Sequence, residues 1–328
     1  MNYKNTFATL ALAISAITSA QAQTPLNVLT YGSFNSDWGP APKLTELFEK
    51  QCDCTLNWLS AEDSVMMLRR LQLEGKALEA DVIVGLDNQS ISDTLNTGLI
   101  QTLQHPVETV FGSSTQAVPF DFGYLAFIKR KNNNLPEFDS LDALAKADNS
   151  LTIAIEDPRT SSVGSTMLAW VGTQTEHPKT FWQNIQPKLT AITTGWSEAY
   201  SLFTNGDVDL VLSYTTSPIY HQLANEHNDY EAILFNHPHY EQIEYAVALA
   251  HSPQSKLSED FLHFLLTPEA QKTIALSNIM YPSTKENVDL PEAFTNAKRP
   301  QGVNLPPEEV AKQMPVWLET WKSALLTP

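Results

Sequence analysis

The sequence predicts an α/β protein built from two lobes, and three observations lead to this fold class. The chain has 328 residues, which is more than one hydrophobic core usually supports. Its first part alternates apolar strand patterns with amphipathic helical patterns, the order of a parallel sheet with right-handed crossovers. Two long apolar segments, 118–127 and 240–250, are interpreted as strands that cross between the lobes.

The first 22 residues have the pattern of a secretory signal peptide. Lys4 gives the positive start, residues 7–17 form an apolar core too short to span a bilayer, and Ala20-Gln21-Ala22 is an A-x-A cleavage site. We therefore expect an exported mature chain that begins at Gln23. The short, Ala-rich signal favours the bacterial periplasm.

The first lobe is expected to comprise residues 23–118 and 247–328, and the second lobe residues 119–246. The opening βαβαβ unit has strands at 26–31, 55–59 and 81–85. A helix covers 40–51, and Ser60 to Asp63 has the form of a capping box for a second helix. Val65, Leu68 and Leu71 occupy one face of that helix at helical spacing.

The later elements alternate in the same way. We expect a strand at 151–156 and helices at 140–147, 162–174, 258–266, 268–276 and 307–325. The last helix carries Val310, Met314, Trp317 and Trp321 on one side, and Pro315 is expected to kink or restart it.

Charge and motifs exclude several function classes. The chain has 37 acidic and 20 basic residues, which argues against nucleic-acid binding and is compatible with a cationic ligand. No G-x-S-x-G elbow, phosphate-binding loop or G-x-G-x-x-G motif supports an enzyme. His237-Pro238-His239 is interpreted as a surface turn, so no metal and no cofactor are expected. Cys52 and Cys54 lack a zinc-like spacing, and a local disulfide is the preferred reading in an oxidising compartment.

The segment 195–220 carries the clearest binding signal. Leu210-Val211-Leu212 predicts a buried strand, and the polar cluster Ser213–Ser217 follows at its end. Pro218 suits the first turn of a helix with Ser217 as its N-cap. Because ligands of open α/β sheets bind at the carboxyl ends of strands, this cluster is expected to meet a small molecule. Alternatively, Tyr214 and Tyr220 are half-buried structural aromatics.

Two further strand ends have a functional and a structural reading. Thr160, Ser161 and Ser162 precede a helix whose N-terminus could accept an anion such as phosphate, helped by Arg159. Equally, Ser161 or Ser162 caps that helix. Asp63 either completes the capping box or turns its carboxylate toward a cation or amine.

Five aromatic residues lie at or beside predicted strand ends. Aromatic faces attract organic cations by roughly 0.5 to 2 kcal/mol per contact. Together with the acidic surface, they suggest a flat, positively charged ligand. The five residues are Tyr31, Trp38, Trp196, Tyr214 and Tyr220.

Seven segments, in order over essentially the whole mature chain, resemble the family of bacterial thiamine-binding periplasmic proteins, the substrate-binding subunits of ABC importers. The Cys52-x-Cys54 pair also fits this family. The segments are 31–40, 85–88, 118–121, 157–161, 195–200, 212–218 and 280–282. In place of the Trp that precedes Met280-Tyr281-Pro282 in the family pattern, this chain has Ile279.

The resemblance implies a type II periplasmic-binding-protein fold with a ligand cleft between two α/β lobes. It implies a monomer that binds thiamine and its mono- and diphosphate and delivers them to a membrane permease. It assigns ligand contacts to Asp63, Ser64, Ser161, Ser162, Trp196, Tyr214, Thr215, Thr216 and Ser217. It assigns further cleft aromatics to Tyr31, Trp38 and Tyr220.

Two alternatives remain at this point. The first is a ferric-iron carrier of the same fold. Such a carrier usually uses adjacent tyrosines, whereas Tyr214 is followed by Thr215. A secreted thiamine-processing enzyme would need a nucleophilic cysteine at the cleft, whereas Cys52 and Cys54 lie at a predicted helix-to-strand turn.

Overall fold

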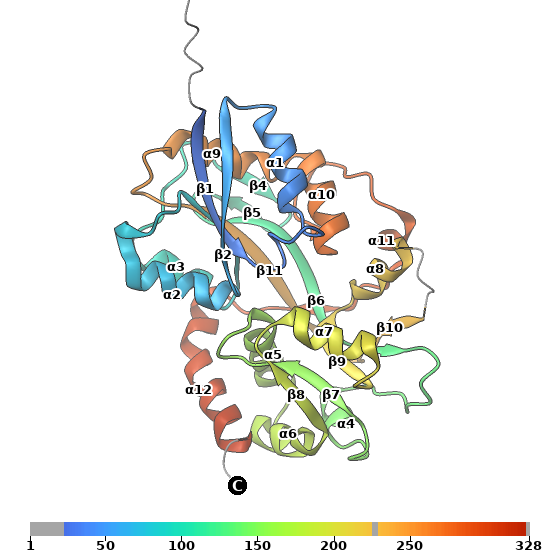
Figure 1. The fold of residues 1–328 in the computed structure, drawn as a ribbon. Coiled ribbons are helices and arrows are strands. Elements are labelled where there is room, and N and C mark those ends of the chain that lie inside the picture. Colours follow the sequence, from blue (N-terminus) through green and yellow to red (C-terminus); the bar gives the residue numbers. More distant parts are fainter. Residues whose placement is uncertain (1–22, 225–228, 326–328) are drawn as a thin grey trace, which may run out of the picture.

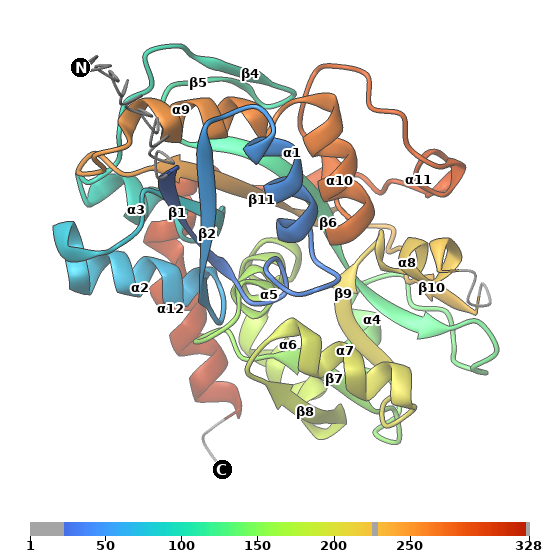
Figure 2. The same ribbon diagram turned by 45° about the horizontal axis from the view of Figure 1, so that its top comes forward.

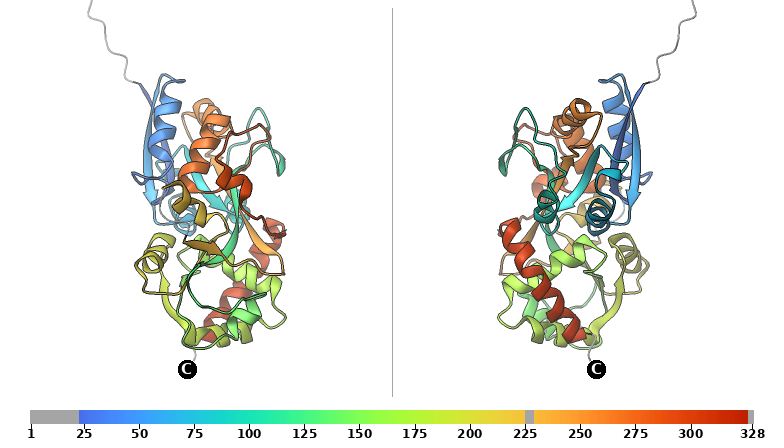
Figure 3. Two further views of the ribbon diagram at one scale, coloured as in Figure 1. Left: turned by 90° about the vertical axis from the view of Figure 1, so that its right-hand side faces the viewer. Right: turned by 90° about the vertical axis from the view of Figure 1, so that its left-hand side faces the viewer.

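The computed structural model describes residues 23–224 and 229–325 (Figure 1). The predicted signal peptide lies outside the described residues. Within them, no helix is both long and apolar enough to cross a membrane. The described chain forms two lobes, which Figure 3 shows one above the other.

The predicted parallel βαβαβ unit is confirmed in the first lobe. Strand β1 pairs in parallel with β2 on one side and with β3 on the other. Helices α9 and α10, from the later part of the chain, return to this lobe (Figure 2). The elements of this lobe are β1 (Thr24–Tyr31), α1 (Ala41–Glu49), β2 (Cys54–Ala61), α2 (Ser64–Glu74), β3 (Val82–Asp87), α3 (Ile91–Asn96), α9 (Ser255–Phe264) and α10 (Pro268–Asn278).

Two long antiparallel strands join the lobes, as the sequence predicted. Strands β6 (Val118–Arg130) and β11 (His239–Ala248) are neighbours in one continuous sheet of order β2-β1-β3-β11-β6-β9-β7-β8. Their apolar residues pack into the cores of both lobes: Val118 and Phe120 into the first, Leu125 and Phe127 into the second. The ligand cleft of such a fold would lie where these strands pass between the lobes.

The second lobe continues the sheet with parallel strands β9 and β8 on either side of β7. The sequence missed α6 and β8, because β8 alternates between exposed and half-buried residues and has no apolar run. The elements are α4 (Leu141–Ala145), β7 (Ile153–Glu156), α5 (Ser162–Gln174), α6 (Pro178–Ile185), β8 (Leu189–Thr193), α7 (Trp196–Asn205), β9 (Leu210–Tyr214), α8 (Ser217–Leu223) and β10 (Tyr230–Ala232).

Helix α2 differs from the prediction in its cap and in its buried face. Strand β2 runs on to Ala61, so Asp63 alone is the N-cap and accepts the backbone N–H of Ser64. This shift turns Met67 and Leu71 inward, while Val65 and Leu68 are only half-buried. The predicted capping box from Ser60 does not form.

The C-terminal helix α12 (Pro307–Leu325) is continuous through Pro315. It packs mainly on α5 and α6 of the second lobe and also contacts α3 of the first lobe. Trp321 and Ala324 are buried in the second lobe's core. Gly172 of α5 leaves room for Trp317, because a β-carbon there would lie 2.3 Å from the Trp317 indole nitrogen. Figures 1 and 3 show this helix (red) beside the second lobe.

Smaller features complete the fold. Cys52 and Cys54 form a disulfide between α1 and β2. His239 is buried and accepts the backbone N–H of Phe235 at 2.9 Å, which contradicts its reading as a surface residue. The remaining short elements are the 3-10 helices Gly75–Ala77 and Gln186–Lys188, β4 (Val107–Thr109), β5 (Gly112–Ser114), β12 (Tyr281–Pro282), α11 (Glu292–Asn296) and β13 (Gly302–Val303).

Candidate functional site

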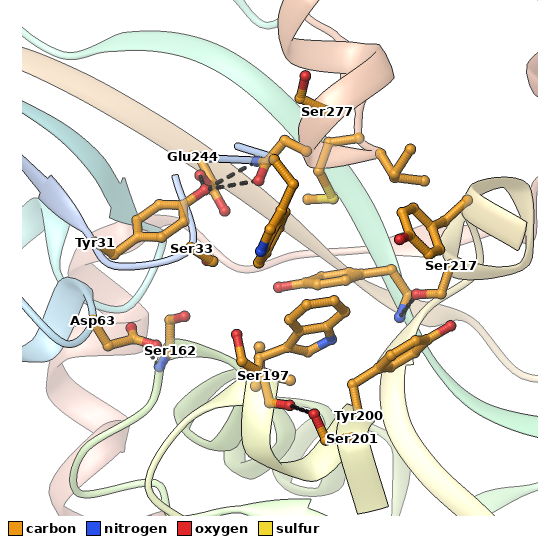
Figure 4. Close-up of a pocket in the computed structure, with 18 of the residues that line it drawn as sticks. Tyr31, Ser33, Asp63, Ser162, Ser197, Tyr200, Ser201, Ser217, Glu244 and Ser277 are labelled. Carbon is orange, nitrogen blue, oxygen red and sulfur yellow. Dashed lines mark hydrogen bonds between the residues drawn. The ribbon is translucent and has the colours of Figure 1, made fainter. Parts of the chain in front are cut away.

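A cavity of about 400 Å³ lies between the lobes, and both lobes contribute its walls (Figure 4). The end of β1, the start of α2 and the end of α10 face it from the first lobe. The starts of α5 and α8, the end of β9 and one side of α7 face it from the second. Eight of the twelve predicted site residues line it: Tyr31, Trp38, Asp63, Ser162, Trp196, Tyr214, Ser217 and Tyr220.

The other four predicted residues lie behind the cavity wall. Ser64 turns its hydroxyl away and donates to Asp87 Oδ2 at 2.9 Å. Thr215 is buried beside the strand end. Ser161 and Thr216 are fully buried, and their hydroxyls have no hydrogen-bond partner among the described residues. These residues support the loops that carry the lining residues.

The start of α8 differs from the prediction by one residue. Thr216 occupies the N-cap position, and Ser217 is the first helical residue. Ser217 Oγ accepts the backbone N–H of Tyr214 at 3.2 Å and shares a hydrogen bond of 2.7 Å with Ser213 Oγ. Ser213 Oγ in turn accepts Trp196 Nε1–H at 2.8 Å. This chain of contacts fixes the indole of Trp196 relative to the end of β9.

The aromatic residues are distributed from the base of the cavity to its mouth. Trp196 stacks on Tyr200 with ring centres 4.7 Å apart, and the Tyr200 hydroxyl lies 3.0 Å from His221 Nε2. Trp38 and Tyr220 remain 53% and 47% exposed at the cavity mouth. The structure therefore places each predicted aromatic on the cavity, in addition to any packing role.

Asp63 connects the two lobes. Its Oδ1 accepts the backbone N–H of Ser64 at 2.6 Å and that of Ser162, across the cleft, at 2.8 Å. Burial and the neighbouring Asp87 carboxylate together raise the pKa of Asp63 to about 6, against the effect of these hydrogen bonds. The prediction that its carboxylate faces the cleft agrees with the cavity lining. The other reading, that Asp63 completes a capping box, is replaced by a different role, since Asp63 is itself the N-cap of α2.

The sequence analysis missed a second carboxylate, Glu244 on β11. Tyr31 donates its hydroxyl to Glu244 Oε2 at 2.8 Å (Figure 4). Asn278 at the end of α10 donates its amide to the Tyr31 hydroxyl at 3.0 Å and to Asp121 Oδ2 at 2.9 Å. Burial and the nearby Asp121 raise the pKa of Glu244. An acidic residue inside an apolar crossing strand was the signal available in the sequence.

Other lining residues were not predicted, because most of them occupy helices whose pattern shows only amphipathicity, and Ser33 and Met280 lie in loops. Hydroxyl groups are frequent among them. They are Ser33, Val163, Ser197, Tyr200, Ser201, Thr204, His221, Ser277, Asn278 and Met280.

The electrostatics of the cavity favour a cation. Asp63 and Glu244 line it, and the described lining residues include no lysine or arginine. Arg159 was expected to help bind an anion. Instead, it donates a hydrogen bond to the Asp157 carboxylate, and its guanidinium carbon lies 5.5 Å from the centre of the Trp321 ring. The N–H of Ser162 at the start of α5 is already taken by Asp63. One backbone donor of the predicted anion site is therefore already in use.

Comparison with known proteins places the chain in a family. Residues 39–276 match the family model described as bacterial extracellular solute-binding protein. The chain is 39% identical to the thiamine-binding periplasmic protein of Escherichia coli K12 over 310 residues, covering 93% of this chain and 94% of that protein. The chain belongs to the family of thiamine-binding periplasmic proteins. The Brucella melitensis member is 37% identical over 327 residues, covering 97% of both chains.

Solved structures agree with this family. A periplasmic thiamin-binding protein superposes with a TM-score of 0.87 at 40% identity, covering 92% of this chain and 96% of that one. A ferric binding protein from Campylobacter jejuni superposes with a TM-score of 0.75 at 18% identity, covering 91% of this chain and 99% of that one. The second similarity shows the fold alone. The two-lobe type II fold expected for the thiamine-binding family is confirmed.

Ile279, which occupies the position where the resemblance led us to expect a Trp, lines the cavity at the end of α10. Its backbone has φ 55° and ψ 41°, a left-handed conformation that β-branched residues rarely adopt. Its side chain packs beside Phe122 and Tyr281. An aliphatic side chain thus forms the part of the wall where a member with Trp would present a ring.

Proposed function

We propose that this chain binds thiamine in the periplasm and delivers it to the membrane permease of an ABC importer. The observation that carries the proposal is the cavity, which combines aromatic faces and two carboxylates with no lysine or arginine among its described lining residues. The relatives at 37–39% identity are named for thiamine binding. The predicted signal peptide supports a location in the periplasm.

The chemistry of thiamine suits this set of residues. Its thiazolium ring is a permanent cation, which aromatic faces and carboxylates attract. Its aminopyrimidine ring has an amino group that donates to a carboxylate. In the proposal, Trp196 and Tyr214 contact the flat rings, and Asp63 and Glu244 accept hydrogen bonds or balance the positive charge.

The proposal includes thiamine mono- and diphosphate as ligands. Because Asp63 occupies the N–H of Ser162, a phosphate group would use other donors. Ser197 and Ser201 lie on the side of α7 that faces the cavity (Figure 4), and their hydroxyls suit a phosphate tail. Neutral donors offset the free-energy cost of burying an anion less than cationic donors do. We therefore expect a lower affinity for thiamine diphosphate than for thiamine.

We infer that the chain acts as a monomeric carrier and performs no chemistry on the ligand. Closure of the two lobes around the ligand would produce the form that docks on the permease. Both cysteines of the sequence are in the disulfide, so a cysteine nucleophile of the kind a thiamine-cleaving enzyme needs is not supplied. Among the described residues, no group of three His, Cys, Asp or Glu side chains could hold a metal ion.

Calorimetric titration of the refolded, ligand-free mature protein tests the proposal. Thiamine, its two phosphates and ferric citrate are titrated in parallel, with tryptophan fluorescence as a second signal. One-to-one binding of thiamine with a change in fluorescence is expected. Heat with ferric citrate and none with thiamine would contradict the proposed ligand.

A further inference from the structure

Three acidic side chains lie in one row across the central sheet. Glu244 of β11 is directly paired with Asp121 of β6 on one side and with Asp87 of β3 on the other. Directly opposite residues of neighbouring strands share a face of the sheet, and like charges there repel one another. All three side chains are at most 7% exposed. A row of three buried anions therefore needs compensation.

The three carboxyl groups differ in their hydrogen bonds. Asp87 accepts the hydroxyls of Ser64 and Ser90 and the backbone N–H groups of Gln89 and Ser90. Burial raises the pKa of Asp87, and these hydrogen bonds oppose the rise. Glu244 accepts the Tyr31 hydroxyl, and Asp121 accepts the Asn278 amide. Asp121 Oδ1 is buried and has no hydrogen-bond partner within the described part of the chain. Asp121 and Glu244 therefore have fewer hydrogen-bond donors than Asp87, and their negative charge is the part of the row that is not compensated.

The groups that face Glu244 do not supply a positive charge. Tyr31 faces it from β1, Asp63 from the start of α2, Asp87 from β3, Asp121 from β6 and Tyr214 from β9. Each of these groups is neutral or acidic. No metal-binding group is found among the described residues. Compensation must come from a proton or from a cation in the cavity that Glu244 lines.

We propose that the Asp121–Glu244 pair exchanges a proton for the cationic ligand. Without ligand, the pair holds one proton between its two carboxyl groups. When the cation enters the cavity, the O–H bond of the protonated carboxyl breaks, its proton leaves to water, and the ligand's charge replaces it. Glu244 contacts the ligand in this scheme, and Asp121 is a positioning residue that acts through Glu244. The inference rests on the proposed function and adds the proton linkage to it.

The physical basis is that two interacting buried carboxyl groups titrate as a unit. Burial raises the pKa of Asp121 to about 7, and that of Glu244 also lies above its ordinary value. Near neutral pH the pair is therefore partly protonated. A fixed cation beside Glu244 favours the fully ionised pair and lowers its proton affinity. Ligand binding and proton release are then linked.

The test is calorimetric titration of the mature protein with thiamine at pH 6.5 in two buffers, phosphate and bis-Tris, which both buffer at this pH and whose ionisation enthalpies differ greatly. A released proton adds the buffer's heat to the observed enthalpy, so the difference between buffers counts protons. About one released proton per thiamine is expected. The thiamine affinity should also fall by roughly tenfold per pH unit below the pKa of the pair. Equal enthalpies in the two buffers would overturn the inference while leaving thiamine binding intact.

Variants of Asp121 and Glu244 test whether the released proton comes from this pair of carboxyl groups. Asp121→Asn removes the like charge beside Glu244 and so lowers the proton affinity of Glu244, while burial still raises its pKa. Proton release should fall, with one-to-one binding kept. Glu244→Gln should do the same with weaker binding, and the exposed Asp93→Asn is the matched control that should release as the wild type does. Undiminished release from folded Asp121→Asn protein would overturn the assignment. Absence of thiamine binding by the wild type would instead refute the proposed function, and the linkage with it.

Discussion

Asp63 Oδ1 accepts the backbone N–H of Ser162 at 2.8 Å and so ties the start of α2 in the first lobe to the start of α5 in the second. The same oxygen accepts Ser64 N–H at 2.6 Å. One carboxylate thus caps a helix, bridges the lobes and lines the cavity. Its three roles can be separated by substitution.

Asp63→Asn keeps an oxygen that accepts both N–H groups but removes the negative charge. We expect thiamine affinity to fall by about tenfold, with the melting temperature within a few degrees of the wild type. Asp63→Ala removes the cap as well, which costs about 1 kcal/mol of unfolding free energy. Calorimetry and thermal denaturation measure the two effects. A large drop in melting temperature for Asp63→Asn with normal affinity would leave only the capping role.

Trp196→Ala removes the indole that stacks on Tyr200 and donates to Ser213. Thiamine affinity should fall by about tenfold or more, because stacking and cation–π attraction are lost. Trp196→Phe should recover part of this loss, since the aromatic face returns without the Nε1–H donor. Unchanged affinity in Trp196→Ala would remove this residue from the binding site.

Ile279→Trp restores an aromatic ring at the end of α10. Trp lacks the β-branching that makes φ 55° unfavourable for Ile279, so the fold should tolerate it. One added aromatic contact with a cation should tighten thiamine binding by about two- to fivefold. Ile279→Leu is the control and should bind as the wild type does. Weaker binding by the Trp variant would show that the cavity needs the smaller aliphatic side chain.

The stability of the ligand-free protein should decrease as the pH rises from about 4 to 7.5. Burial raises the pKa of Asp63 to about 6 and that of Asp121 to about 7, from 3.8 for both. The folded state therefore binds more protons than the unfolded state in this window, and unfolding free energy is lost as these groups ionise. For Asp63 alone the loss is on the order of 3 kcal/mol. Glu46, with a pKa lowered to about 2, acts in the opposite sense only at more acidic pH.

Differential scanning calorimetry across this range checks the expectation. The melting temperature should fall by several degrees between pH 4.5 and pH 7.5 in the absence of ligand. A melting temperature that rises over the same interval would show that the buried acids do not hold protons in the folded state.

The fold was largely predictable because its apolar runs are unambiguous. Leu210-Val211-Leu212 predicted β9, and the long apolar segments predicted β6 and β11. The placement of α12 was not predictable. The helical spacing of Trp317 and Trp321 indicates that one face of this helix is buried, but it does not indicate which lobe covers that face. Only the fold shows that Gly172 leaves room for Trp317.

The site was predictable where residues follow a strand end and not where they lie inside an element. Trp196, Tyr214 and Ser217 were found in this way. Glu244 was missed, since an acidic residue within a strand is usually on an exposed face. Ser161 was expected to cap α5 or meet a ligand. It occupies the N-cap position, but its buried hydroxyl has no partner among the residues that the structure describes, because the cap position alone does not set the side-chain direction.

The most direct test of the central claim is a crystal structure of the mature protein grown with thiamine. The account predicts thiamine in the cavity between the lobes, with a ring against Trp196 and its positive charge near Glu244 and Asp63. Thiamine bound elsewhere on the protein, with this cavity unaltered, would contradict the assignment of the site.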